Sequence, residues 1–126
     1  MKNLQKIAVI GSGTMGNGIA HVAAQSKCRA LLVDINQSQL DEAMKTIENN
    51  LDRQIKKSII SLDEKVLTLS NIALSTNISD CRNADLVIEA IPERYDLKAS
   101  IFRDLDSICK DETIFAVKES DINKKN

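Results

Sequence analysis

The chain has 126 residues, which is enough for one globular domain with a hydrophobic core. Its formal net charge is −1 and the sequence shows no basic stripe, which argues against nucleic acid as a partner. No apolar run reaches the ~20 residues of a membrane helix, and the first predicted strand begins too early for a signal peptide, so we expect a cytoplasmic protein.

The first predicted strand, residues 5–10, ends its apolar run at a glycine. Glycines follow at the G-x-G-x-x-G spacing, as Gly11, Gly13 and Gly16. An Ala-rich segment, residues 19–24, then indicates a helix, which we predict over residues 14–26. This strand–turn–helix order is the context in which such glycines bind a dinucleotide.

Each of the three glycines has its own predicted role. Gly11 permits a tight turn off the strand, Gly13 lets the backbone approach a pyrophosphate, and Gly16 lets the helix pack close to the strand. The first N–H groups of the helix, backed by the positive end of its dipole, then face the ligand.

A second apolar segment, residues 30–33, predicts a parallel strand that is covered on both faces. It ends at Asp34, eighteen positions after Gly16, close to the ~20 positions expected for an acidic residue that binds the adenosine ribose. A carboxylate there would repel a 2′-phosphate, so Asp34 favours NAD over NADP. The alternative interpretation is a polar strand end or a helix cap.

A second helix is predicted to follow, ending near Lys57. Asn36 can cap it, or Ser38 can do so in a capping box with Asp41. Its apolar stripe consists of Leu40, Ala43, Met44, Ile47, Leu51 and Ile55. The cations at its far end suit the negative end of the helix dipole. The alternative interpretation is that they contact an anionic ligand.

A third, short helix is predicted at residues 62–69, where Ser61 and Glu64 have the spacing of a capping box. Together with the second helix it forms a hairpin that is larger than a minimal crossover requires. We expect this hairpin to project from the edge of the sheet.

Three further strands are predicted, at residues 72–75, 85–91 and 113–117. A polar stretch, residues 76–83, separates the first two, and a helix at residues 95–109 separates the last two. The cysteines Cys28, Cys81 and Cys109 form no C-x-x-C pair, which is typical of incidental thiols in a reducing compartment and predicts no metal site.

This order of elements predicts an α/β fold, namely a Rossmann-like doubly wound parallel sheet with an extra helical hairpin after the second strand. The expected strand order is 3-2-1-4-5, with the cofactor across the carboxyl ends of the strands. We assign residues 1–117 to this domain and expect residues 118–126 to be a disordered charged tail.

Three segments, Ile7 to Ala24, Leu32 to Asp34 and Asp85 to Glu93, together resemble the N-terminal domain of 3-hydroxyacyl-CoA dehydrogenases. The resemblance is greatest to the bacterial 3-hydroxybutyryl-CoA dehydrogenases and spans residues 4–116. It implies a Rossmann-like NAD domain followed by a helical domain that closes the acyl-CoA site and forms the dimer. It also implies reversible oxidation of an (S)-3-hydroxyacyl-CoA, with hydride transfer to NAD.

The resemblance carries over residue by residue. It assigns the pyrophosphate turn to Gly11, Ser12, Gly13, Thr14, Met15 and Gly16. Asp34 matches the ribose-binding acid, and Glu93 and Lys98 match residues on the nicotinamide side of the cofactor. Lys57 matches a position that contacts the coenzyme A portion of the substrate. Without the resemblance, Glu93 and Lys98 are ordinary charges at a helix start.

No catalytic residue is assigned. His21, the single histidine, lies on the first helix, where we expect a structural role. After the last strand the family reads Ser-Asn-Thr-Ser-Ser, but Ser120 stands in a different context, so that substrate role is not transferred to it. The chain ends before the family's catalytic His–Glu pair and helical domain, so we expect NAD(H) binding with little turnover.

Three functions follow from these observations. The first is the NAD-binding portion of a 3-hydroxybutyryl-CoA dehydrogenase of fatty-acid or butanoate metabolism, which binds acyl-CoA weakly if at all. The second is a non-catalytic NAD-binding module or half-enzyme that needs a partner chain to supply the missing C-terminal domain. The third is another Rossmann enzyme, such as a methyltransferase, against which Asp34 and the match around residues 85–93 argue.

Overall fold

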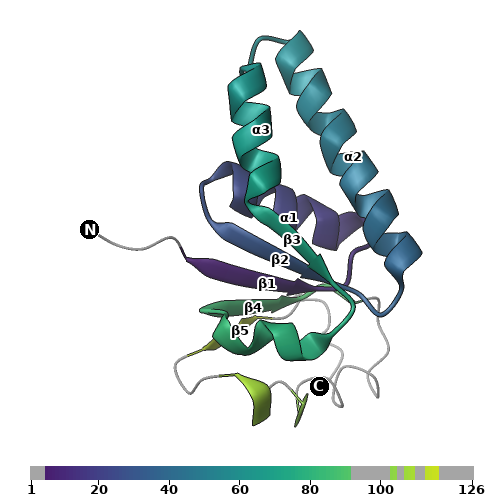
Figure 1. Ribbon diagram of the computed structural model, residues 1–126, viewed down its shortest axis with the longest axis vertical. Coiled ribbons are helices and arrows are strands. Elements are labelled where there is room, and N and C mark those ends of the chain that lie inside the picture. Colours follow the sequence, from purple (N-terminus) through teal and green to yellow (C-terminus); the bar gives the residue numbers. More distant parts are fainter. Residues whose placement is uncertain (1–4, 92–102, 105–106, 110–112, 117–126) are drawn as a thin grey trace, which may run out of the picture.

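The computed structural model describes residues 5–91, 103–104, 107–109 and 113–116. Within them, five strands form one parallel sheet with the order β3-β2-β1-β4-β5 (Figure 1). The strands are β1 (Lys6–Ile10), β2 (Arg29–Val33), β3 (Ile72–Ser75), β4 (Leu86–Glu89) and β5 (Ile114–Ala116). The predicted doubly wound α/β fold and its strand order are therefore confirmed.

Strand β1 is central and is covered on both faces. Val9 packs in a cluster with Ala20 of the first helix, whereas its neighbour Ala8 packs with Cys81 on the opposite face. Both strand residues are fully buried. Successive side chains of a strand point to opposite faces, so an uninterrupted apolar run is what a strand in this position requires.

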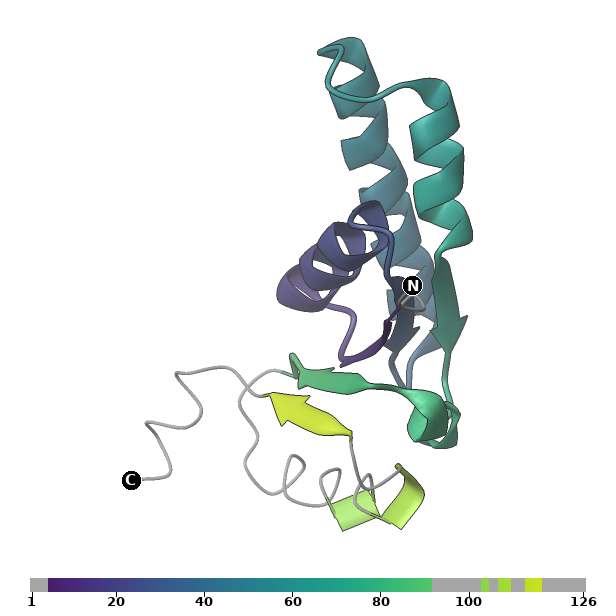
Figure 2. The same cartoon turned by 90° about the vertical axis from the view of Figure 1, so that its left-hand side faces the viewer.

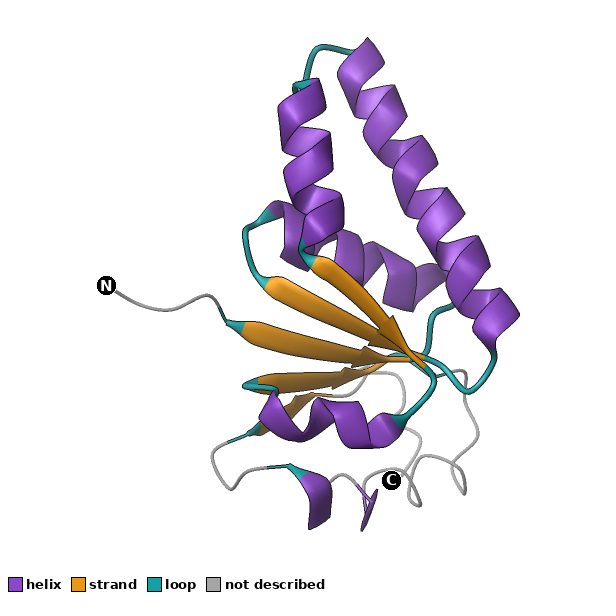
Figure 3. Cartoon of the chain, in the orientation of Figure 1, coloured by secondary structure: helices purple, strands orange, loops and turns teal. Residues whose placement is uncertain are grey.

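Within residues 5–91, three α-helices cover one face of the sheet, and a 3₁₀ helix lies on the other (Figures 2 and 3). They are α1 (Thr14–Gln25), α2 (Gln37–Lys56), α3 (Leu62–Ser70) and η1 (Ile78–Asn83). This division follows from the chain path, because right-handed crossovers toward β3 place helices on one face and the return crossover to β4 uses the other.

The helices α2 and α3 form the predicted hairpin, which extends beyond the edge of the sheet (Figure 1). Four residues of the predicted stripe are buried, namely Leu40, Ala43, Ile47 and Leu51. Met44 and Ile55 are half-buried. Lys65 of α3 also pairs with Asp52 of α2 at 2.7 Å, which ties the two helices together.

The caps of the hairpin helices were predicted in part. Ser61 and Glu64 form the expected capping box at the start of α3. At the start of α2, Asn36 is the N-cap and accepts a hydrogen bond from the Ser38 N–H at 3.0 Å. The alternative box of Ser38 with Asp41 was wrong, because Ser38 lies inside the helix and donates its own hydroxyl to Asn36.

The polar stretch 76–83 contains η1, which the sequence pattern did not predict. Asn77 caps this 3₁₀ helix, and η1 places Cys81 in the core. The fourth strand was predicted too long, since β4 ends at Glu89. Beyond it the Ala90 N–H donates to the Ile10 carbonyl at 2.8 Å, so the chain still lies beside the end of β1 there.

The last part of the chain is described in pieces. Of the predicted helix 95–109, residues 103, 104, 107 and 108 are helical and residue 109 forms a bend, whereas the other residues of this range lie outside the described residues. The predicted tail, residues 118–126, also lies outside them. None of the helices in the described ranges is long and apolar enough to cross a membrane.

Candidate dinucleotide site

The turn between β1 and α1 depends on the backbone of Gly11. Its φ is +101°, a conformation that residues with a side chain rarely adopt. The Gly11 N–H donates to the Val33 carbonyl at 2.7 Å, which ties the turn to β2. A Cβ atom on Gly11 would lie 3.0 Å from the carbonyl carbon of Ala90, so the turn also packs closely against the end of β4.

Gly16 allows the first turn of α1 to lie against the Gly11 backbone. A Cβ atom at this position would overlap the Gly11 carbonyl oxygen, whereas the nearest strand side-chain atom, Val9 Cγ1, would be 3.6 Å away. We predicted close packing of the helix on the strand. The structure places the closest approach at the turn itself, so Gly16 fixes where the helix starts.

Gly13 lies open to solvent at the start of α1. A Cβ atom there would meet nothing within 4 Å. Gly13 is the N-cap of the helix but supplies no side-chain hydrogen bond, and the first turn of α1 contains no acidic residue. The first N–H groups of a helix have no acceptor within it, so they and the helix dipole favour an anion in this open space.

Asp34 lies beside this turn, at the carboxyl end of β2. Its Oδ2 atom accepts from both the N–H and the hydroxyl of Ser12, at 3.0 and 2.8 Å. Its Oδ1 atom accepts from the Asn36 N–H at 3.0 Å. The glycine turn and the acidic residue are thus joined by direct contacts, as the spacing of the two motifs requires of a single nucleotide site.

Sequence reasoning missed Ile35, whose side chain is 90% exposed directly after Asp34. A large apolar side chain so exposed beside a candidate sugar-binding carboxylate offers an apolar contact surface at the site. The sequence feature that could have indicated it is an isoleucine in an otherwise polar stretch between a strand and a helix cap.

Glu89 was also missed. It lies at the carboxyl end of β4, in register with Ile10 of β1, and is fully buried. Its carboxylate accepts a hydrogen bond from the Ile91 N–H. Glu89 thereby shapes the β4 end of the site, where the chain passes Gly11. The sequence feature that could have indicated Glu89 is an acidic residue inside an apolar strand.

His21 lies inside the protein and not in the site. Its ring is buried, and Nε2 lies 2.8 Å from Gln25 Oε1. The amide nitrogen of Gln25 in turn donates to Gln54 of α2 at 2.7 Å. This polar chain joins α1 to α2, which agrees with the expected structural role.

The structure does not test all of the predicted site residues. Glu93, Lys98 and Ser120 lie outside the described residues. Lys57 is exposed and follows α2 at the tip of the hairpin, well away from the turn between β1 and α1 (Figure 1). Among the described residues, no cluster of His, Cys, Asp or Glu side chains could hold a metal ion.

Comparison with known proteins agrees with this geometry. Residues 6–126 match the family model of the 3-hydroxyacyl-CoA dehydrogenase NAD binding domain. A 3-hydroxybutyryl-CoA dehydrogenase of Bradyrhizobium diazoefficiens is 39% identical over 120 residues, which cover 95% of this chain and 41% of that protein. The chain thus spans less than half the length of this curated relative.

Two solved structures have the same fold. The (S)-3-hydroxybutyryl-CoA dehydrogenase of Ralstonia eutropha superposes with a TM-score of 0.87 at 36% identity, covering 91% of this chain and 41% of that one. A 3-hydroxybutyryl-CoA dehydrogenase of Escherichia coli gives a TM-score of 0.90 at 37% identity, covering 94% of this chain and 25% of that one. The similarity therefore extends over nearly all of this chain.

Proposed function

Because the chain belongs to the 3-hydroxyacyl-CoA dehydrogenase family through its NAD-binding domain, we propose that it binds NAD(H) at the turn between β1 and α1. The observation that carries the proposal is the double hydrogen bond from Ser12 to Asp34, which joins the open glycine turn to a carboxylate. A dinucleotide needs both groups within one site, one for its pyrophosphate and one for its ribose.

The described residues fit this cofactor. The open space at Gly13 and the N–H groups of the first turn of α1 suit the pyrophosphate, for which Ser12, Thr14 and Met15 form the rest of the turn. Asp34 accepts from the ribose hydroxyls, and its charge disfavours the 2′-phosphate of NADP. Ile35 supplies an apolar contact for the adenine ring.

The remaining assignments rest on the family resemblance. We propose that Glu93 and Lys98 line the nicotinamide side and that Lys57 contacts coenzyme A. When bound, NAD supplies the hydride acceptor for oxidation of a 3-hydroxyacyl-CoA. That chemistry also needs a base for the hydroxyl proton, and the chain's single histidine, His21, is buried against Gln25. The chain alone therefore binds the cofactor with little turnover.

We propose that catalysis needs the part of the protein that relatives carry in addition, since the chain covers 41% of the Bradyrhizobium enzyme. That part is either a continuation of the chain or a partner that docks on it. Cys28, Cys81 and Cys109 carry free thiols, which suit a reducing compartment such as the cytoplasm.

The test is a titration of the chain with NADH. Binding is detected by the fluorescence emission of the nicotinamide, because the chain has no tryptophan whose fluorescence could report it. We expect saturable binding that Asp34→Ala weakens by about tenfold, since a charge-assisted hydrogen bond to the ribose is lost. The same variant should narrow the preference for NADH over NADPH. Asp41→Ala, on an exposed turn of α2, is the matched control.

Absence of NADH binding by the folded chain would refute the proposal. Turnover is tested separately by adding acetoacetyl-CoA and following NADH absorbance. Rapid oxidation by the chain alone would show that a catalytic group had been overlooked.

A further inference from the structure

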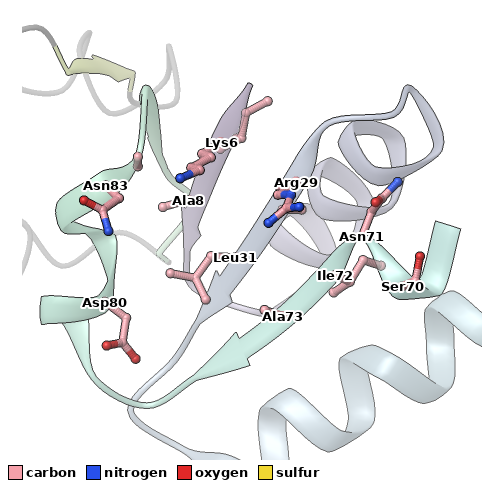
Figure 4. A pocket seen from close by; sticks show the side chains of 13 residues that line it. Lys6, Ala8, Arg29, Leu31, Ser70, Asn71, Ile72, Ala73, Asp80 and Asn83 are labelled. Atoms are coloured by element: carbon pink, nitrogen blue, oxygen red, sulfur yellow. The ribbon is translucent and has the colours of Figure 1, made fainter. Parts of the chain in front are cut away.

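A hollow of about 500 Å³ opens on the sheet face that carries η1, and it is separate from the nucleotide site. It lies at the amino ends of β1, β2 and β3, bounded by η1 on one side and by the residues after α3 on the other (Figure 4). The glycine turn follows the opposite end of β1, five residues or roughly 15 Å away. We refer to this hollow as the amino-end pocket.

Two cations stand next to each other in the amino-end pocket. Lys6 and Arg29 are the first residues of β1 and β2 and are direct register partners, so their side chains leave the same face of the sheet. Both are exposed. Neither belongs to an ion pair within the described part of the chain. Adjacent like charges on neighbouring strands repel each other, and an anion bound between them would remove that cost.

The rest of the pocket supplies neutral polar groups and an apolar floor. Asn83 of η1 lies across from Lys6, and Asn71 lies beyond Arg29 (Figure 4). Ala8, Leu31 and Ala73 line the sheet between these walls. Cationic and amide donors next to small apolar residues suit a ligand that has an anionic head and a compact apolar body.

One carboxylate also lines the pocket. Asp80 lies on the wall formed by η1 and accepts a hydrogen bond from the Ser75 hydroxyl at 2.6 Å. Ser75 is the last residue of β3, whereas Lys6 and Arg29 begin their strands. The Lys6–Arg29 side of the pocket therefore lies away from this carboxylate, at the other ends of the strands (Figure 4).

We propose that the amino-end pocket binds a small phosphate monoester. The phosphate lies between Lys6 and Arg29 with Asn83 as a further donor, and the organic group lies on Leu31 and Ala73. Two neighbouring cations match the double charge of a phosphate monoester better than the single charge of a carboxylate. This inference does not depend on NAD binding, since the two sites lie at opposite ends of β1.

The probe is phenyl phosphate, added to the 13.9 kDa chain in the presence of saturating NADH and followed by amide ¹H–¹⁵N spectra. We expect saturable shifts at Ala8, Leu31 and Ala73 and no further shift at Gly11 or Gly13. Benzoate should bind about tenfold more weakly, because it carries one charge instead of two. If NADH does not bind, the pocket shifts are still expected, so the two proposals fail independently.

Variants identify the groups responsible. Arg29→Gln should weaken phenyl phosphate about tenfold, Lys6→Gln should do the same, and Arg29→Lys should retain most of the affinity. Lys45→Gln, an exposed cation on α2, is the matched control and should change nothing. The proposal is overturned by shifts confined to Gly11 and Gly13, by no shifts, or by pocket shifts that Arg29→Gln leaves unchanged.

Discussion

At the scale of single residues, three glycines near the start of α1 differ in what an added methyl group would meet. At Gly16 it would overlap the Gly11 carbonyl oxygen, and at Gly13 and Gly18 it would meet nothing within 4 Å. Their tolerance of alanine should therefore differ, although all three lie within six residues of one another. The effect of alanine on stability at each glycine therefore depends on the space available to the added methyl group.

Gly16→Ala should lower the free energy of unfolding by at least ~2 kcal/mol, because the backbone must move to admit the methyl group. Gly18→Ala is the matched control inside the same helix and should raise the stability by roughly 0.5–1 kcal/mol. Urea denaturation measures both. Equal stabilities for the two variants would contradict the close approach of Gly16 to the turn.

Gly13→Ala separates folding from binding. We expect at most a modest loss of stability, up to ~1 kcal/mol, because alanine is a poorer N-cap than glycine although the methyl group has open space around it. Affinity for NADH should fall, because the same space is where the pyrophosphate would lie. Urea denaturation and the NADH titration give the two readings. Unchanged NADH affinity would place the pyrophosphate elsewhere.

The buried thiol of Cys81 gives a prediction about pH. Burial raises the pKa of Cys81 from 9.0 to about 12, and the neighbouring Cys109 and Asp80 add to the rise. In the unfolded chain the thiol ionises near its ordinary pKa, so the unfolded state loses its proton first as pH rises. The contribution of Cys81 to stability is thus constant below pH 9 and declines between pH 9 and about 12.

Urea midpoints at pH 8 and pH 10.5 test this expectation. The urea midpoint of the unmodified chain should be lower at pH 10.5 than at pH 8. The midpoint of Cys81→Ala should decrease less between the two pH values, whatever its stability at pH 8. Iodoacetamide should also label Cys28 long before Cys81 in the folded chain, because alkylation needs the thiolate. Early labelling of Cys81 would contradict its buried position.

At the scale of elements, the capping box at Ser61 holds the start of α3. The Ser61 hydroxyl accepts from the Glu64 N–H at 3.1 Å, and the Glu64 carboxylate accepts from the Ser61 N–H at 3.0 Å. Ser61→Ala should therefore cost ~1 kcal/mol of stability and raise amide exchange in the first turn of α3. Ser70→Ala, at the other end of the helix, should have little effect. Equal costs would mean that the box does not hold the helix.

The elements that were predicted correctly depend on local chemistry. Ser61 and Glu64 lie three residues apart, and the stripe from Leu40 to Leu51 repeats at helical spacing, so both could be read from neighbouring residues. The errors depended on distant contacts. The extent of β4 depends on its pairing with β1, nearly eighty positions away, and η1 packs Cys81 into a core that the sequence does not display.

At the scale of the whole molecule, the candidate site joins segments that are adjacent only after folding. The glycines and Asp34 were predicted because their spacing reflects a shared chain path. The hydrogen bond from Ser12 to Asp34 could not be predicted, since it depends on the alignment of Ile10 with Val33 in neighbouring strands. Ile35 and Glu89 were missed because exposure and burial appear only in the folded chain.

This chain is shorter than the enzymes that it resembles, which gives a prediction about the whole molecule. A chimera that continues this chain, from residue 117 onward, with the corresponding part of a relative should oxidise NADH with acetoacetyl-CoA. The chain alone should not do so, because its single histidine is buried in the α1–α2 contact. Asp34→Ala in the chimera should raise KM for NADH more than it changes kcat. An inactive chimera that folds and binds NADH would contradict this division of roles.

Asp34 illustrates a preorganised site. Three donors hold its two oxygen atoms, which fixes the rotamer of the side chain. Ordering a mobile side chain on association costs ~0.5–1.5 kcal/mol, and here that entropy is lost during folding instead. In the proposed complex, a ribose hydroxyl would take the place of the Ser12 hydroxyl at an acceptor whose direction is already set.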